Sequence, residues 1–186
     1  MLGTIAIPRG HFTAPWPFVE SLVRYLELHP DVRVIFREGA LIEENRNSLA
    51  SMFWGDWIFF IDDDMVFKPE DIEAIISHDE DIVCGLYFRG QVPHEPMAFI
   101  ENKPIKNYIS GLIIEVDGCA MGFTKISRKA IEAVGLNGFS RLPNLGEDLS
   151  FCQRAKLKGF KIYCDTSVQP KHLRYKYIGE NDSILI

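Results

Sequence analysis

The sequence predicts an α/β protein whose central sheet is mostly parallel and is covered by helices on both faces. Two observations lead to this prediction. Short apolar stretches alternate with segments of helical spacing from residue 2 to residue 86, in the order β-α-β-α-β-α-β. The stretch at residues 58–61 is apolar at every position, as in a parallel strand that is buried on both faces.

The first half is expected to contain four strands, and a helix connects each strand to the next. The strands are expected at residues 2–7, 32–36, 58–61 and 81–86. Apolar side chains follow helical spacing in residues 16–26, 41–52 and 69–76. Pro30 ends the first helix, because a proline disfavours the helical conformation in the residue before it, whereas Pro69 suits the first turn of the third helix.

The second half is less regular and is expected to add small antiparallel strands at residues 97–100 and 112–116. A helix at residues 128–134 has Ser127 as its N-cap and Gly135 as its C-cap. A last helix and a last strand follow, at residues 147–158 and 160–164. We expect residues 166–186 to form a mobile tail and the whole chain, residues 1–186, to be a single domain.

The composition narrows the classes of function. The chain is 47% hydrophobic and 12% aromatic, which argues against disorder. Its net charge of -6 disfavours non-specific binding to nucleic acid, which needs a basic face. No Cys-x-x-Cys pair is present, so we expect buried, reduced thiols and a cytoplasmic location. Neither a signal peptide nor a membrane span is expected, because no apolar run approaches about 18 residues.

Three carboxylates, Asp62, Asp63 and Asp64, follow directly after the apolar stretch at residues 58–61. They would repel one another unless a cation lies nearby. In an extended chain Asp62 and Asp64 point to the same side, and Asp63 points away. Because ligands bind at the carboxyl ends of strands in open α/β sheets, a divalent cation is one interpretation of the triplet. An acidic turn that caps the helix beginning at Pro69 is the other interpretation.

Three further polar clusters accompany the triplet. Glu147 and Asp148 open the last expected helix, where they either complement the helix dipole or provide a general base. Arg46, on the second expected helix, is either polar surface or part of the same cleft. The last cluster, His172, Arg174 and Lys176, follows the last strand. It is either a solvated basic tail or a functional segment, in which His172 binds a metal and Arg174 and Lys176 bind phosphate.

The order of these clusters resembles the GT-A class of nucleotide-sugar glycosyltransferases, most closely its inverting family 2 group. The strand that ends in Asp62-x-Asp64 before a proline-started helix is similar to the D-x-D strand of that class, and Arg46-Asn47 is similar to the Arg-Asn one helix earlier. Residues 117–135 resemble the segment that lines the sugar and acceptor pocket, and residues 146–159 resemble the Glu-Asp helix. The resemblance extends from residue 2 to residue 176.

The resemblance implies a metal-dependent enzyme that uses Mn²⁺ or Mg²⁺. Asp62, Asp64 and His172 would be the metal ligands, and a nitrogen ligand would favour Mn²⁺. Asp148 would be the general base that deprotonates the acceptor hydroxyl, and Glu147 beside it is the second catalytic candidate. A larger set of residues would bind the nucleotide sugar: Pro8, Arg9, Glu38, Arg46, Asp62, Asp63, Gly118, Arg174 and Lys176.

The implied reaction moves a sugar, with inversion, from a UDP- or GDP-linked donor to the hydroxyl group of a glycan, a lipid-linked acceptor or a small molecule. Three features depart from the family pattern: the chain is short, the loop after the first strand reads Pro8-Arg9-Gly10-His11, and the loop after the second strand lacks the usual Asp-Asp/Gly-Ser cluster. Alternatives are a retaining transferase, a sugar-phosphate nucleotidyltransferase, and a non-catalytic module that binds nucleotide or carbohydrate. The sequence leaves open an oligomeric state and a peripheral association with a membrane.

Overall fold

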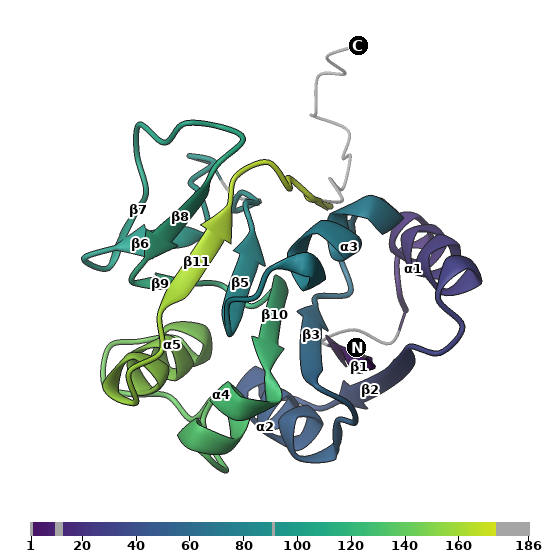
Figure 1. Ribbon diagram of the computed structural model, residues 1–186, viewed down its shortest axis with the longest axis horizontal. Helices are drawn as coiled ribbons and strands as arrows, with labels where there is room; N and C mark the ends of the chain where they lie inside the picture. The colour runs from purple at the N-terminus through teal and green to yellow at the C-terminus, as the bar shows by residue number, and fades with distance from the viewer. Residues whose placement is uncertain (1, 10–12, 91, 174–186) are drawn as a thin grey trace, which may run out of the picture.

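The computed structural model describes residues 2–9, 13–90 and 92–173, and its main sheet has the strand order β2-β1-β3-β10-β5-β11-β8 (Figure 1). Most of these strands run in one direction: β1 (Gly3–Arg9), β2 (Arg33–Glu38), β3 (Trp57–Ile61), β5 (Ile82–Gly85) and β11 (Ile162–Asp165). Two run against them: β10 (Phe123–Ser127) and β8 (Ile113–Val116). The mostly parallel sheet that the sequence predicts is therefore confirmed.

Helices cover both faces of this sheet, as expected. On one face lie α1 (Trp16–Leu28) and α3 (Pro69–Ser77), and on the other lie α2 (Ile42–Met52), α4 (Arg128–Val134) and α5 (Glu147–Leu157). Each face has its own hydrophobic cluster, and β3 contributes to both. Phe60 belongs to the cluster under α2 and α5, whereas its neighbour Phe59 belongs to the cluster under α1 and α3. This alternation explains why β3 is apolar at every position.

The second half contains an antiparallel strand that was not expected. β10, which the sequence pattern did not reveal, lies in the middle of the sheet between β3 and β5. Its sequence does not show the continuous apolar pattern of a central strand, because it contains the polar residues Thr124 and Lys125. Both are nevertheless buried. The ammonium group of Lys125 donates a hydrogen bond to the backbone carbonyl of His78 at 2.6 Å, which satisfies the buried charge in part. The expected edge addition is confirmed by β8, which pairs antiparallel to β11.

Two small sheets complete the fold. One contains β6 (Ala98–Ile100), β7 (Lys103–Pro104) and β9 (Gly118–Cys119). The other is a two-stranded ladder of β4 (Met65–Val66) and β12 (Lys171–His172), in which His172 lies opposite Met65. This ladder brings a segment near the end of the described chain next to the acidic triplet.

Residues 166–173, expected at the start of a tail, are part of the fold. Thr166 and Val168 are buried, and β12 forms its ladder with β4. The rest of the expected tail, including Arg174 and Lys176, lies outside the described residues. Within the ranges that the structure describes, no helix is both long and apolar enough to cross a membrane.

Candidate functional site

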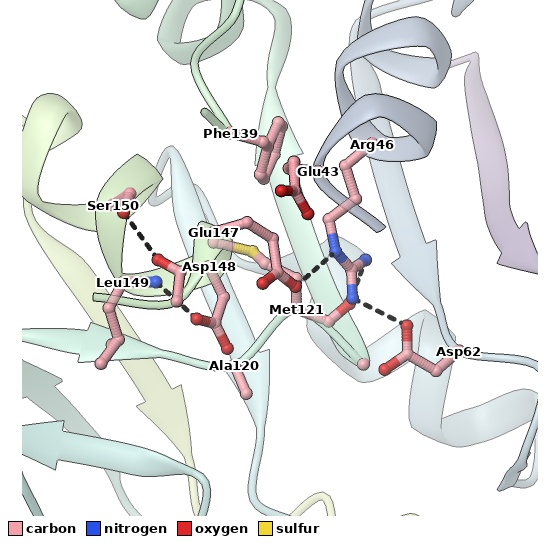
Figure 2. A network of polar contacts seen from close by, with 12 residues as sticks. Glu43, Arg46, Asp62, Ala120, Met121, Phe139, Glu147, Asp148, Leu149 and Ser150 are labelled. Atoms are coloured by element: carbon pink, nitrogen blue, oxygen red, sulfur yellow. Dashed lines mark hydrogen bonds and ion pairs between the residues drawn. The ribbon is translucent and has the colours of Figure 1, made fainter. Parts of the chain in front are cut away.

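Arg46 is the centre of a polar network at the carboxyl end of β3. The side chain is only 3% exposed. Its Nη2 donates to Asp62 Oδ1 at 2.8 Å, and its Nη1 donates to the backbone carbonyl of Met121 at 3.3 Å. Its Nε lies 3.5 Å from Glu147 Oε1 (Figure 2). One guanidinium group on α2 therefore joins the end of β3, the segment before β10 and the start of α5.

The surroundings of Arg46 keep it charged. Burial alone would lower the pKa of the guanidinium group, but the negative charges of Asp62, Glu147 and Asp148 raise it by more. The guanidinium carbon also lies 5.4 Å from the centre of the Phe60 ring, within range of a cation–π contact. Loss of one carboxylate partner would be costly, because it would leave part of the charge of a buried cation uncompensated.

Glu147 and Asp148 are adjacent at the start of α5 but have different surroundings. Glu147 lies between Arg46 and Arg141, whose Nη2 is 3.9 Å from Glu147 Oε2. Burial, followed by the charge of Glu147, raises the pKa of Asp148 to about 6, although the Leu149 amide donates to Asp148 Oδ1 at 2.7 Å. Glu147 thus faces cations, and Asp148 has the pKa expected of a group that exchanges protons near neutrality.

The acidic triplet is a turn rather than an extended segment. The Met65 amide donates to the carbonyl oxygen of Asp62 at 3.1 Å, so the side-chain alternation expected for an extended chain does not apply. Asp62 faces Arg46, and Asp64 faces His172. Asp63 is 7% exposed. The two carboxylates that we expected to converge on one point therefore contact different partners.

Asp64 and His172 form a close pair at the β4–β12 ladder. His172 Nε2 lies 2.9 Å from Asp64 Oδ2, and its Nδ1 lies 3.2 Å from the backbone carbonyl of Phe88. Both ring nitrogens face oxygen atoms, one of the Asp64 carboxylate and one of a backbone carbonyl. A carboxylate oxygen and an imidazole nitrogen that approach one another, with the second nitrogen held by a carbonyl, suit a metal-binding pair.

The expected three-ligand set is not assembled. Across residues 2–9, 13–90 and 92–173, no group of three or more His, Cys, Asp or Glu side chains is arranged to hold a metal. Asp62, the third expected ligand, is engaged by Arg46 instead.

The nucleotide-binding candidates of the first strands lie together at the same edge of the sheet. Arg9 and Glu38 are opposite one another in the register of β1 and β2, and Pro8 precedes Arg9. The side-chain Nδ2 of Asn45 donates to the backbone carbonyl of Arg9 at 3.4 Å and to that of Gly39 at 3.2 Å. These two hydrogen bonds link the ends of the two strands. Asn45, which precedes Arg46 on α2, therefore supports this corner.

Gly118 lies against α5. A Cβ atom at this position would be 2.8 Å from Leu149 Cδ2 and 3.4 Å from the Cβ of Cys152. The absence of a side chain allows β9 to approach the helix that carries Glu147 and Asp148. Its contacts are thus packing contacts that position the helix.

Tyr87, which the sequence analysis did not single out, contacts Gly122 of the segment at residues 117–135. The Gly122 amide donates to the Tyr87 hydroxyl oxygen at 2.9 Å, and the Gly122 carbonyl accepts from the Asp62 amide at 3.0 Å. A Cβ atom on Gly122 would lie 2.5 Å from the Tyr87 hydroxyl oxygen and 2.9 Å from Asp62 Oδ2. Tyr87 follows the end of β5, so the rule that sites form at the carboxyl ends of strands could have identified it.

Comparisons with known proteins agree with this geometry. Residues 17–135 match the family model described as Glycosyl transferase family 2. A search of curated protein sequences finds no match. Among solved structures, A197 from STIV is similar at 22% identity with a TM-score of 0.68, and the match covers 92% of this chain and 85% of A197.

Two more distant structures share the fold. GalNAc-T7 in complex with UDP, GalNAc and Mn²⁺ is 14% identical with a TM-score of 0.59, and the match covers 91% of this chain and 43% of GalNAc-T7. The inositol-1-phosphate CTP transferase from T. maritima is 12% identical with a TM-score of 0.53, and the match covers 91% of this chain and 88% of that one. At these identities the similarity shows a common fold, that of the GT-A class.

Proposed function

The chain belongs to glycosyl transferase family 2, and we propose that it uses the site around Arg46 to move a sugar from a nucleoside diphosphate sugar to a hydroxyl acceptor, with inversion. The observation that carries this proposal is the Arg46 network. It joins Asp62, at the end of β3, to Glu147, which is adjacent to Asp148 on α5. A donor held near the strand end would then have a candidate base on the other side of the same network.

Asp148 is the proposed general base. With a pKa of about 6 it is mostly ionised at neutral pH, yet it is a stronger base than an ordinary carboxylate. It accepts the proton of the acceptor hydroxyl while the acceptor oxygen forms a bond to the anomeric carbon. The bond between that carbon and the phosphate oxygen breaks, and the nucleoside diphosphate leaves with the electron pair. Attack on the face opposite the leaving group inverts the anomeric centre.

Glu147 is the proposed positioning residue. Because Arg46 and Arg141 flank it, Glu147 would link the start of α5 to Arg46 on α2. Its charge is also one cause of the raised pKa of Asp148. The two carboxylates, both catalytic candidates in the sequence, would thus have separate tasks.

Donor binding is proposed at the edge formed by β1, β2 and β3. Pro8, Arg9, Glu38 and Asp62 would contact the nucleotide, and Arg174 and Lys176 would contact the phosphates. Mn²⁺ or Mg²⁺ would be held by Asp64 and His172, with Asp62 as a further candidate, and would supply positive charge to the leaving diphosphate. The presence of UDP, GalNAc and Mn²⁺ in the GalNAc-T7 structure supports UDP among the donor nucleotides. A cytoplasmic location remains part of the proposal.

A thermal-shift panel tests the donor class. UDP, GDP, ADP, TDP and CMP are compared with and without Mn²⁺, because a ligand that binds only the folded state raises the melting temperature. We expect one nucleotide to stabilise the protein strongly only when Mn²⁺ is present. Proton NMR of the product with the corresponding sugar donor then reports the anomeric configuration. Retention of configuration would contradict the role of Asp148.

A further inference from the structure

A cavity lies beside the Arg46 network. It has a volume of about 500 Å³, within the range of about 300–1,000 Å³ that is usual for ligand pockets. It lies between the start of α2 and the segment that joins α4 to α5. All but one of its lining residues are polar, and they provide carboxylates, amides, a hydroxyl and a guanidinium group: Glu43, Glu44, Asn47, Asn137, Ser140 and Arg141.

The segment at residues 138–140, which contributes Ser140 to the lining, is held from two helices. Asn47 on α2 accepts a hydrogen bond from the Phe139 amide at 2.9 Å. Arg154 on α5 donates to the carbonyls of Gly138 at 2.8 Å and Ser140 at 2.6 Å. The Phe139 ring also stacks on Phe151 of α5, with ring centres 4.5 Å apart. The cavity therefore has a fixed wall, which reduces the entropic cost of binding a ligand there.

Glu147 connects this cavity to the proposed catalytic site. Arg141 Nη2 lies 3.4 Å from Glu43 Oε2 and 3.9 Å from Glu147 Oε2. The other oxygen of Glu147 faces Arg46. Figure 2 shows Glu43 and Glu147 on one side of the guanidinium group of Arg46 and Asp62 on the other. The cavity thus adjoins Glu147, and Asp62 lies on the other side of the Arg46 guanidinium group.

We propose that this cavity binds a hydroxyl-rich carbohydrate, which is the acceptor of the transfer; the inference rests on the proposed function. In an inverting reaction the acceptor must approach from the side of the base, opposite the leaving diphosphate. The cavity adjoins Glu147, the neighbour of the base Asp148, whereas the diphosphate would lie toward Asp64. Its donors and acceptors match sugar hydroxyl groups, which both donate and accept.

The same lining disfavours the other acceptor classes. Leu41 is the single apolar lining residue, so a lipid chain would find little apolar surface. Glu43 and Glu44 in the wall, with Glu147 nearby, outnumber Arg141, so a phosphorylated group would meet net repulsion. A lipid-linked acceptor would be recognised through its sugar.

The test is a double substitution, Glu44→Gln with Asn137→Gly, in the full chain. Glu44 and Asn137 are exposed, and Asn137 has a φ of 62°, which glycine adopts without strain. Glu27→Gln, an exposed glutamate on α1, is the matched control. Saturation-transfer NMR with lactose, cellobiose and chitobiose measures carbohydrate binding, and n-octanol is the apolar probe. Initial rates with the disaccharide that binds best measure KM, and calorimetry measures the affinity for the nucleoside diphosphate.

We expect a disaccharide to bind and the double variant to raise its Kd and KM by roughly tenfold, with unchanged affinity for the nucleoside diphosphate. Glu27→Gln should change neither. Disaccharide binding that the double variant weakens, without transfer by the wild type, would support the cavity and contradict the proposed function. Four outcomes would overturn the assignment of the cavity. In two of them the double variant leaves either the KM of transfer or the affinity for the disaccharide unchanged. In the other two the protein binds n-octanol alone or binds no probe.

Discussion

The two ends of the site each carry neighbouring carboxylates, but the protein surrounds them differently. After β3, Asp62 faces Arg46 and Asp64 faces His172. At the start of α5, Glu147 lies between two arginines, whereas burial and the charge of Glu147 raise the pKa of Asp148 to about 6. Carboxylates beside basic partners can bind or position, while a buried carboxylate beside another negative charge can accept a proton near neutrality. The comparison separates the roles of residues that look alike in the sequence.

The largest expected effect is at the base. Asp148→Asn removes the proton acceptor, so kcat should fall by roughly 10²–10⁴-fold. Metal-dependent stabilisation by the nucleoside diphosphate should remain, because the substitution is on α5, away from Asp64. Rate assays and thermal shift measure the two quantities, and Asp31→Asn, in the turn before β2, is the control. A variant that retains wild-type kcat would place the base elsewhere.

The second expected effect is at the other end of the site. Asp64→Asn should lower activity by roughly 10–100-fold and abolish the extra thermal shift that Mn²⁺ adds to the nucleoside diphosphate. The neighbouring Asp63 provides the contrast because it is 7% exposed and faces the protein interior. Asp63→Asn should lower the melting temperature and keep the Mn²⁺-dependent shift. Equal losses of that shift in both variants would mean that Asp63 also contributes to metal binding.

The pH dependence of kcat/KM should report the different surroundings of Glu147 and Asp148. Activity should fall as pH drops through about 6, where Asp148 becomes protonated. In Glu147→Gln the loss of a nearby negative charge lowers the pKa of Asp148, so the acid limb should move to lower pH. The pH–rate profiles of both proteins provide the measurement. An acid limb that stays in place would exclude Asp148 as the titrating group.

The last expected effect concerns folding stability rather than activity. The pKa of Asp148 is about 6 in the folded state, above its ordinary value of 3.8, so the ionised form is disfavoured by folding. Ionisation of Asp148 therefore lowers stability as pH rises from about 4 to about 6. Asp148→Asn should be more stable than the wild type at pH 7, by up to about 3 kcal/mol, and the difference should disappear near pH 4. Denaturant unfolding at the two pH values measures the difference.

Strands and helices with a clear apolar period could be located from the sequence. α1 ends before Pro30 and α3 begins at Pro69, as predicted. Ser127 Oγ accepts a hydrogen bond from the Ala130 amide, which confirms Ser127 as the N-cap of α4. β10 could not be located from the sequence, because the polar residues Thr124 and Lys125 interrupt its apolar pattern. Both are buried in the structure, where the carbonyl of His78 accepts a hydrogen bond from Lys125. The prediction that the side chains of the acidic triplet alternate in direction was wrong, because the backbone hydrogen bond from Met65 to Asp62 forms a turn there.

By itself the sequence determined the α/β class, the family resemblance and the residue types available at the strand ends, because periodicity and local motifs depend on neighbours along the chain. Only the tertiary structure decided which charges meet. The β4–β12 ladder brings His172 to Asp64, and the placement of α2 and α5 on one face of the sheet puts one buried arginine between Asp62 and Glu147. The pKa that distinguishes Asp148 from Glu147 arises from burial and from charges distant in the chain, and these exist only once the chain has folded.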